Sequence, residues 1–489
     1  MIIDFDTSRM ADYRRFLRLK SCPAYQWKGR RAVVPDHYAA HFGVDAPPSS
    51  ADYQPSPFLF DYQAAIARRA IEQKSFAVFA DCGLGKTLIL LEFARHAAQH
   101  GKSLIVCPLM VVSQTAAEAE RFYPDMPIRQ ISASELQDWL NSPGDEIGIT
   151  NYESIRDSID PGRLNCLVLD ESSMLKSHYG KWGTRLLSMA AGCEYRLALT
   201  GTPAPKDRID YANHAVLCGH FRTTNEFLAR YFVNRGQTQN RWELKPHALR
   251  PFYKDLSAWC IFLTNPAVYG WKDNTDTIPP IHVHIDDVEL TREQWDAVRQ
   301  ETGKLVIDSV GGIGQRSVLA RIAKGSYKGE LIPTNKPAAI RKLIDSWPDE
   351  STIIWCRYND EQDLMERTFP EAASIHGSTP LDDRLQMIDD FKSGRVKQLI
   401  SKPKILGFGL NLQVATRQVF SGLQDSYEEF YQAVKRSNRI GSTRPLNVHV
   451  PVTDIEAPMV QNVLSKADRV QADSDEQEQL FKEIVDAGV

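Results

Sequence analysis

A glycine-rich segment between an apolar strand and a helix constrains the fold of this chain more than any other feature. The segment reads Ala80-Asp81-Cys82-Gly83-Leu84-Gly85-Lys86-Thr87. It follows the apolar run at residues 76–79 and precedes a helical pattern at residues 88–97. This order of strand, loop and helix predicts a phosphate-binding loop in a parallel α/β domain, although Ala80 stands where the pattern has its first glycine. Taken alone, the motif would also fit an ordinary loop at the start of a helix.

Each part of the segment has a chemical role in such a site. Backbone N–H groups of Gly83, Leu84 and Gly85 would close around the β-phosphate of a nucleotide at the positive end of the helix. Lys86 would reach the β and γ oxygens, and Thr87 would ligate Mg²⁺. We therefore predict that ATP and Mg²⁺ bind here.

A pair of carboxylates supplies the second half of the predicted site. The apolar run at residues 166–169 ends in Asp170 and Glu171. At the end of a strand, Asp170 could hold the metal through a water molecule, and Glu171 could act as the general base for the attacking water. Alone, the pair would fit equally well at the solvated N-terminus of a helix, where acidic residues are favoured. The glycine-rich segment upstream favours the catalytic interpretation.

Length and composition predict a multidomain globular chain. Its 489 residues exceed what one hydrophobic core usually supports, so we expect about three folding units. No stretch approaches roughly 18 uninterrupted apolar residues, so we expect no contact with a membrane and a cytoplasmic location. The eight cysteines form no C-x-x-C pair, which argues against a zinc site and a disulfide framework. Because the formal net charge is −4, any nucleic acid would need a local basic groove.

Short apolar runs alternate with helical patterns in two parts of the chain. The strands expected in the first part are residues 76–79, 104–107, 147–150, 164–169 and 197–199, and those in the second are 352–356, 398–401, 417–420 and 448–452. This alternation predicts an α/β fold with two parallel-sheet lobes. We place a small accessory module at residues 1–54, a first lobe at 55–204, a helical insertion and linker at 205–280, a second lobe at 281–453 and a bracing helix at 454–489.

Further motifs follow in a fixed order. Thr200-Gly201-Thr202-Pro203 ends the first lobe, His376-Gly377-Ser378 lies in the second, and residues 432–441 read Gln-Ala-Val-Lys-Arg-Ser-Asn-Arg-Ile-Gly. Together with the glycine-rich segment and the Asp-Glu pair, these motifs resemble superfamily 2 helicases, within them the Swi/Snf-like branch, and in particular compact versions from bacteriophage and other mobile elements. The resemblance implies two RecA-like lobes with the P-loop NTPase fold, and ATP hydrolysis coupled to movement along DNA.

The resemblance also implies roles for individual residues. Gln63 would read the adenine, and Gly409 and Asn411 would lie between the nucleotide and the DNA. Arg436 and Arg439 would face the γ-phosphate as arginine fingers, a task suited to the rigid guanidinium fork. In isolation, their spacing of three residues would favour a basic helix face on the surface. The residues expected to contact the nucleic-acid backbone are Thr150, Asn151, Thr200, Thr202, His376, Gly377, Ser401 and Lys402.

The sequence departs from the family pattern directly after the Asp-Glu pair. The family usually has Ala-His there, whereas this chain has Ser172 and Ser173. The link that the histidine would make to the Thr200-Gly201-Thr202 segment must therefore come from a hydroxyl group or be absent.

We expect an ATP-dependent DNA translocase or helicase that acts, as a monomer, on single- or double-stranded DNA. The analogy suggests replication, recombination or repair of a phage or mobile element in a bacterial host cytoplasm, with phage or host replication and repair proteins as partners. Within the motor class, strand separation competes with translocation along duplex DNA. A rival from another class is a nucleic-acid-binding scaffold with weak ATPase activity, and a third alternative is a helicase that acts on RNA.

Overall fold

The chain divides into two compact units, which we describe separately. The computed structural model describes residues 2–6, 9–21, 26–28, 30–34, 42, 53–176, 180–201, 208–235, 242–273, 277–303, 313–406, 410–423 and 427–486. Unit 1 comprises Met1–Asp273 and Asp475–Val489, and unit 2 comprises Asn274–Ser474.

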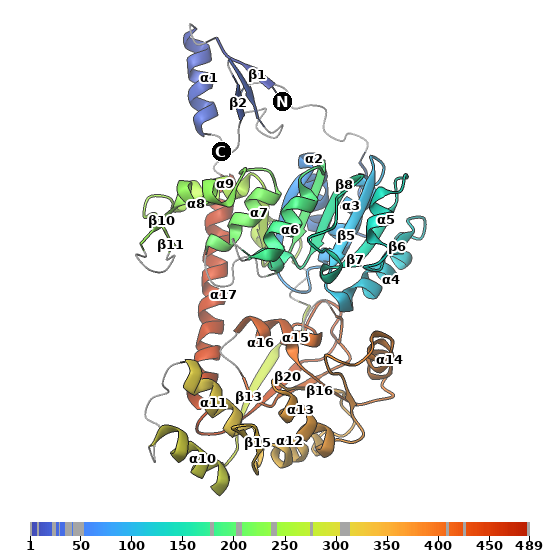
Figure 1. The fold of residues 1–489 in the computed structure, drawn as a ribbon, viewed down its shortest axis with the longest axis vertical. Helices are drawn as coiled ribbons and strands as arrows, with labels where there is room; N and C mark the ends of the chain where they lie inside the picture. The colour runs from blue at the N-terminus through green and yellow to red at the C-terminus, as the bar shows by residue number, and fades with distance from the viewer. Residues whose placement is uncertain are drawn as a thin grey trace. The chain divides into compact units, whose positions relative to one another are not determined.

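Unit 1 is built on a seven-stranded sheet in which every pairing is parallel (Figure 1). The strand order is β12-β4-β9-β8-β5-β7-β6. The bounds are β4 Ser75–Ala80, β5 Lys102–Cys107, β6 Ile128–Gln130, β7 Ile147–Asn151, β8 Leu164–Asp170, β9 Tyr195–Leu199 and β12 Cys260–Leu263. All five strands predicted for the first lobe are therefore confirmed.

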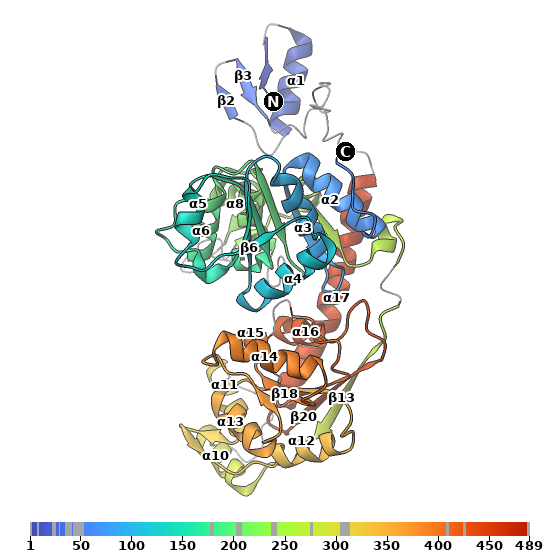
Figure 2. The same cartoon turned by 90° about the vertical axis from the view of Figure 1, so that its right-hand side faces the viewer.

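Helices cover both faces of this sheet. The connections β4–α3–β5 and β8–α6–β9 run in opposite directions across the sheet, so right-handed crossovers place α3 and α6 on opposite faces, as Figures 1 and 2 show. Burial on both faces explains why the central strands are nearly continuous apolar runs. The helices are α2 Asp61–Gln73, α3 Lys86–Ala97, α4 Val112–Phe122, α5 Leu136–Asn141 and α6 Lys181–Ala190, with short 3-10 turns η2 Leu109–Val111, η3 Tyr152–Ser154 and η4 Ser172–Leu175.

The segment predicted as a helical insertion contains strands as well as helices. Its helices are η5 Arg208–Tyr211, α7 Ala212–Leu217, α8 Thr224–Tyr231, α9 Leu249–Ser257 and η6 Pro266–Tyr269. Strands β10 (Phe232–Asn234) and β11 (Trp242–Leu244) pair as an antiparallel hairpin. Strand β12, which the sequence analysis did not predict, pairs in parallel with β4 and completes one edge of the main sheet. Part of the insertion therefore belongs to the body of unit 1.

The two ends of the chain contribute to unit 1. At the N-terminus, β1 (Ile2–Asp4), β3 (Arg31–Val33) and β2 (Gln26–Lys28) form an antiparallel sheet beside α1 (Met10–Ser21), around a small core with Ile3 and Leu19. At the other end, α17 (Ala457–Asp486) begins in unit 2, and its residues from 475 onward belong to unit 1. There Phe481 packs edge-on against Phe262, and Glu478 accepts a hydrogen bond from the Thr264 N–H at 2.9 Å.

Unit 2 contains a second sheet of the same class. Its six strands are all parallel, in the order β13-β20-β19-β16-β18-β17. Their bounds are β13 Ile281–Asp287, β16 Thr352–Trp355, β17 Ala373–Ser374, β18 Gln398–Ser401, β19 Arg417–Phe420 and β20 Leu446–Val452, and a hairpin pairs β14 Ser326–Tyr327 with β15 Glu330–Leu331. The helices are α10 Arg292–Thr302, α11 Ile313–Ala323, α12 Lys336–Asp345, α13 Asn359–Thr368, α14 Leu381–Lys392, α15 Pro403–Leu406 and α16 Tyr427–Val434. The predicted fold class, with two parallel-sheet lobes, is thereby confirmed.

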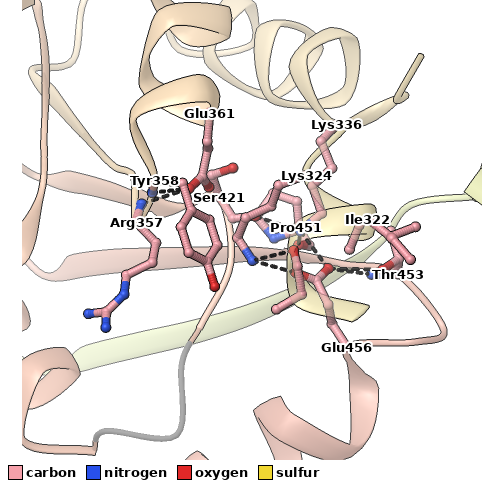
Figure 3. A network of polar contacts seen from close by, with 12 residues as sticks. Ile322, Lys324, Lys336, Arg357, Tyr358, Glu361, Ser421, Pro451, Thr453 and Glu456 are labelled. Atoms are coloured by element: carbon pink, nitrogen blue, oxygen red, sulfur yellow. Dashed lines mark hydrogen bonds and ion pairs between the residues drawn. The ribbon is translucent and has the colours of Figure 1, made fainter. Parts of the chain in front are cut away.

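A buried ionic network ties together the carboxyl ends of two strands of unit 2 (Figure 3). The Glu456 carboxylate accepts from Lys324 Nζ at 2.8 Å and lies 2.6 Å from Lys336 Nζ, and these three side chains are almost fully buried. Lys336 also donates to the backbone oxygens of Ser421 at 2.5 Å and Pro451 at 3.0 Å. The network therefore fixes the loop after β19 and the end of β20 to the start of α12.

All seven cysteines in the described part of the chain are buried free thiols. Among the residues described, no helix combines the length and the apolar character needed to cross a membrane.

Candidate nucleotide-binding and catalytic site

The glycine-rich segment forms the turn between β4 and α3 that the sequence predicts. Gly83 and Gly85 have φ angles of +91° and +66°, a region that favours glycine. A Cβ atom at Gly85 would lie 2.3 Å from Gln63 Nε2, so no larger residue fits there without displacing Gln63. The helix that follows begins at Lys86, and its N-terminus receives no side-chain cap. Its first N–H groups can therefore bind an anion.

Lys86 and Thr87 stand at the first two positions of α3. Lys86 Nζ donates to the backbone oxygens of Ala80 at 2.8 Å and Asp81 at 3.1 Å, so the ammonium group lies over the loop. Thr87 is partly buried at the same helix end. Both side chains are within the segment that would surround a phosphate.

Gln63 lies beneath the phosphate loop and is almost fully buried. Its Nε2 contacts the backbone oxygens of Leu84 at 3.4 Å and Gly85 at 3.3 Å, while its Oε1 accepts from the Phe60 N–H at 3.0 Å. The neighbouring Tyr62 hydroxyl donates to the Leu84 oxygen at 3.0 Å. Both ends of the Gln63 amide are thus engaged within the chain, and reading an adenine would require it to exchange these contacts.

The two predicted carboxylates lie at the carboxyl end of β8, two strands from β4 in the sheet. Burial, followed by repulsion from Glu171, raises the pKa of Asp170 to about 6, and the nearby Lys86 charge offsets part of this rise. Glu171 adopts φ +53° and ψ +53°, a left-handed conformation that costs roughly 1–2 kcal/mol in a residue with a side chain. The Tyr152 hydroxyl donates to the Asp170 backbone oxygen at 2.7 Å. The turn therefore places the Asp170 carboxyl group near both Lys86 and Glu171.

Thr200 connects a third strand end to the carboxylates. It follows β9, which lies between β4 and β8, and its side chain is fully buried. Its hydroxyl donates to Glu171 Oε1 at 2.7 Å. The phosphate loop, the carboxylates and Thr200 therefore meet at the carboxyl edge of adjacent parallel strands, where ligands bind in open α/β sheets.

A hydroxyl link between this turn and the Thr200 segment is present, but Thr200 supplies it, and among the described residues neither serine after the carboxylates is seen to do so. The Thr200 hydroxyl bonds directly to Glu171, as described above, while Ser172 Oγ lies 3.0 Å from Nε2 of His214 on α7. Sequence reasoning missed His214 and the role of Tyr152. His214 stands in a short, mostly buried helix 42 residues beyond Ser172, and nothing in the sequence alone points to its contact with Ser172.

The other residues predicted to contact nucleic acid in unit 1 are engaged in the fold. Thr150 is buried, and its hydroxyl donates to the Ile131 oxygen at 2.8 Å. Asn151 Oδ1 accepts from the Ser154 N–H at 3.1 Å and caps η3. Thr150 therefore offers no exposed group to DNA in this structure. Thr202 lies outside the described residues.

In unit 2, the predicted backbone-contacting residues lie just after β17 and at the end of β18. His376 Nε2 contacts Glu366, and with Asp363 these side chains place three ligand atoms within 4.8 Å of one another. The Gly377 oxygen accepts from Arg384. Ser401 is buried and donates to the Ile375 oxygen at 2.8 Å, whereas the exposed end of Lys402 contacts Asn359. Of the four, Ser401 has no exposed side chain to offer a ligand.

The two predicted arginine fingers lie in the turn after α16. Arg436 is only 3% exposed, Arg439 is partly buried, and neither belongs to a helix. The Leu412 N–H donates to the Arg436 oxygen at 3.0 Å, so this turn packs against the segment of Asn411, whose Oδ1 accepts from the Gln413 N–H at 3.3 Å. The alternative of a basic surface helix is therefore wrong. Gly409 lies outside the described residues.

Comparison with known proteins gives two adjoining matches. Residues 65–323, more than half of the chain, match the SNF2-related domain, and residues 335–441 match the helicase conserved C-terminal domain.

Two curated relatives and one solved structure illustrate what this chain is similar to. The mouse DNA annealing helicase and endonuclease ZRANB3 is 22% identical over 76% of this chain and 36% of its own length. The Caenorhabditis elegans SWI/SNF-related matrix-associated actin-dependent regulator of chromatin subfamily A-like protein 1 homolog is 23% identical over 85% of this chain and 62% of its own length. The chain thus spans less than two thirds of these relatives. A solved Sulfolobus solfataricus SWI2/SNF2 ATPase core in complex with dsDNA is 21% identical, with a TM-score of 0.40 over 89% of this chain and 95% of that one.

Proposed function

This chain belongs to the SNF2-related family of superfamily 2 helicases, and from that premise we propose that it is an ATP-driven motor that moves along DNA. The observation that carries the proposal is the meeting of Lys86, Asp170 and Glu171 with Thr200 at one edge of a parallel sheet. A phosphate-binding turn beside one buried and one partly buried carboxylate residue is suited to hydrolysis of a nucleoside triphosphate.

The residues of unit 1 divide the chemistry among them. The N–H groups of the phosphate loop and the Lys86 ammonium would bind the β- and γ-phosphates. The Asp170 carboxyl, whose pKa is raised by burial beside Glu171, fits a neighbouring divalent cation, because a cation would favour its ionised form. Mg²⁺ held by Thr87 and Asp170 would supply charge neutralisation at the phosphate oxygens. Glu171, oriented by Thr200, would accept the proton of the attacking water.

Unit 2 would complete the ATP site and supply the second grip on DNA. We propose that Arg436 and Arg439 approach the γ-phosphate when ATP is bound, and that its loss on hydrolysis releases them. Residues near His376, Gly377 and Lys402 would hold the DNA backbone. Backbone contacts carry no sequence information, so the motor would tolerate any sequence.

DNA as the track is supported by the printed names of relatives, which include a DNA annealing helicase. A role in the replication, recombination or repair of a phage or another mobile element rests on the motif resemblance alone.

Steady-state ATP hydrolysis, titrated in parallel with single-stranded DNA, duplex DNA and RNA, tests the proposal. We expect Mg²⁺-dependent turnover that either form of DNA stimulates more strongly than RNA does. Glu171→Gln should still bind ATP but hydrolyse it about 10²–10⁴-fold more slowly. The control is Glu120→Gln, at an exposed position of α4, which should behave as wild type. If RNA alone stimulated ATP turnover, RNA would take the place of DNA as the track of the motor. Undiminished turnover in Glu171→Gln would overturn the assignment of Glu171 as the general base.

A further inference from the structure

The turn that carries Glu171 is held by a second set of contacts besides the one from Thr200. Glu171 itself keeps a left-handed backbone, and Ser172 directly after it is fully buried. Ser172 Oγ lies 3.0 Å from Nε2 of His214, which is also fully buried. A serine hydroxyl can donate or accept, so either tautomer of the imidazole makes this hydrogen bond. The residue next to the general base is therefore fixed by a side chain from a distant helix.

Helix α7 holds this turn at two points. Beside His214, the Asn213 side chain donates from Nδ2 to the Leu175 oxygen, the last residue of η4, at 2.7 Å. The first and last residues of η4 are thus both bonded to consecutive residues of α7. Two such anchors restrain the position and rotation of the short turn, and so restrain the backbone from which Glu171 projects.

The His214 ring also contacts the strand that leads to the phosphate loop. It packs edge-on against Phe79 of β4, with ring centroids 5.2 Å apart and an angle of 88° between the rings. Phe79 is followed by Ala80, whose oxygen accepts from Lys86. Burial lowers the pKa of His214 to about 4, so the ring is neutral at pH 7 and brings no charge to the site. It therefore contacts both halves of the candidate site through packing and hydrogen bonding.

We propose that His214 is a positioning residue for ATP hydrolysis, which acts through Ser172 to keep the Glu171 carboxylate aligned with Thr200 and the attacking water. This inference rests on the proposed function, in which Glu171 is the general base. Thr200 orients the end of the Glu171 side chain, and the Ser172–His214 bond fixes its backbone. Catalytic geometry is sensitive to such support, because a displacement of about 1 Å can cost roughly a hundredfold in rate.

A merely structural role would predict different behaviour from a positioning role. His214→Leu and Ser172→Ala each leave one buried polar group without this bond, whereas the double variant removes both groups together. If the pair only satisfies buried polar atoms, the double variant should recover both stability and turnover. If the pair positions Glu171, the double variant should recover stability and remain slow.

The test measures kcat, the KM for ATP, ATP affinity and melting temperature for the full chain with duplex DNA. We expect kcat to fall about ten- to a hundredfold in His214→Leu, Ser172→Ala and the double variant alike, with the KM for ATP and ATP affinity within about twofold of wild type. His214→Gln, whose amide can still reach Ser172, should recover part of the lost kcat. The matched control is His220→Leu, which removes a second fully buried histidine of unit 1, one that packs near Trp259 and should leave kcat unchanged.

The possible results separate this inference from the proposed function. Wild-type kcat in His214→Leu or in the double variant would overturn the positioning role while leaving the motor proposal intact. Effects of the two single variants that add fully in the double variant would also overturn it, because residues acting through one bond are not additive. A wild-type chain without ATP turnover, or Glu171→Gln with full turnover, would overturn both.

Discussion

Replacing Glu456 with glutamine should destabilise unit 2 by about 3 kcal/mol. The carboxylate is fully buried between Lys324 and Lys336, and it also accepts from the Thr453 hydroxyl at 2.9 Å. Burial alone would raise the pKa of Glu456, but the two lysines hold it at about 2, compared with an ordinary value of 4.5. At about 1.4 kcal/mol for each pKa unit, this shift corresponds to roughly 3 kcal/mol, the same range found when one member of a buried ion pair is removed.

The loss of stability in Glu456→Gln is limited because a buried lysine can release its proton. Burial lowers the pKa of Lys336 below its ordinary value even with Glu456 present. In Glu456→Gln, Lys336 is therefore the lysine expected to release its proton, which avoids the cost of two uncompensated charges. The two hydrogen bonds from Lys336 to Ser421 and Pro451 would weaken, and the ends of β19 and β20 should loosen first.

Amide hydrogen exchange measures this effect in unit 2 separately from unit 1. In Glu456→Gln the amides of β19 and β20 should exchange about a hundredfold faster than in wild type, whereas those of β4 and β8 should not change. The control Glu371→Gln removes a half-exposed partner of Arg341 and should cost less than about 0.5 kcal/mol. If Glu456→Gln lowered the free energy of unfolding by less than about 1 kcal/mol, the buried carboxylate would not stabilise unit 2 as argued.

The pH dependence of the network has a defined sign. The folded-state pKa of Glu456 lies below its unfolded value, so its contribution to stability is complete above about pH 4.5 and is lost as the pH falls towards 2. Between pH 7 and 5 the contribution of Glu456 itself should therefore stay constant, while the stability deficit of Glu456→Gln should grow as the pH falls, because Lys336 of the variant is neutral in the folded state and charged in the unfolded state. A deficit that disappears within that range would mean that the lysines do not lower the pKa of Glu456.

Three further substitutions test the candidate site. Lys86→Ala should abolish DNA-stimulated ATP turnover in a steady-state assay, and turnover near wild type would remove Lys86 from the phosphate site. Asp170→Asn should also abolish turnover but raise the melting temperature at pH 7.5. The folded-state pKa of Asp170 lies above its unfolded value, so ionisation of this carboxyl group destabilises the fold as the pH rises from about 4 to 6. An unchanged or lower melting temperature of Asp170→Asn would contradict this. Arg439→Ala should slow hydrolysis in single-turnover measurements while ATP affinity stays close to wild type, and a loss confined to affinity would exclude the finger role.

The sequence predicted the sheets well where strands are buried on both faces. Strands β5 and β8 are apolar runs bounded by turns, and such runs are recognisable without knowledge of their partners. Strand β12 has only four residues within an aromatic-rich helical region, and its strand conformation depends on pairing with β4. Strand β13 was not predicted, although Ile281, Val283 and Ile285 alternate with polar residues as in a strand; most of its side chains are exposed in the structure.

The site was predictable where a single segment contains it. The phosphate loop needs only its own glycines and the strand and helix beside it. The contacts of Thr200 with Glu171 and of His214 with Ser172 join residues far apart in the sequence, and they depend on strand order and helix packing. The inward direction of the Thr150 hydroxyl likewise follows from its place on β7, which motif matching does not reveal.

Displacement of a third strand from a DNA triplex, with ATP hydrolysis recorded in the same reaction, tests most directly whether this chain is a motor on DNA. With ATP and Mg²⁺ the wild-type chain should release the third strand from a blunt duplex, and neither a non-hydrolysable ATP analogue nor Glu171→Gln should support release. Release without hydrolysis would contradict the account, as would strong DNA-stimulated hydrolysis with release from neither the triplex nor a forked duplex.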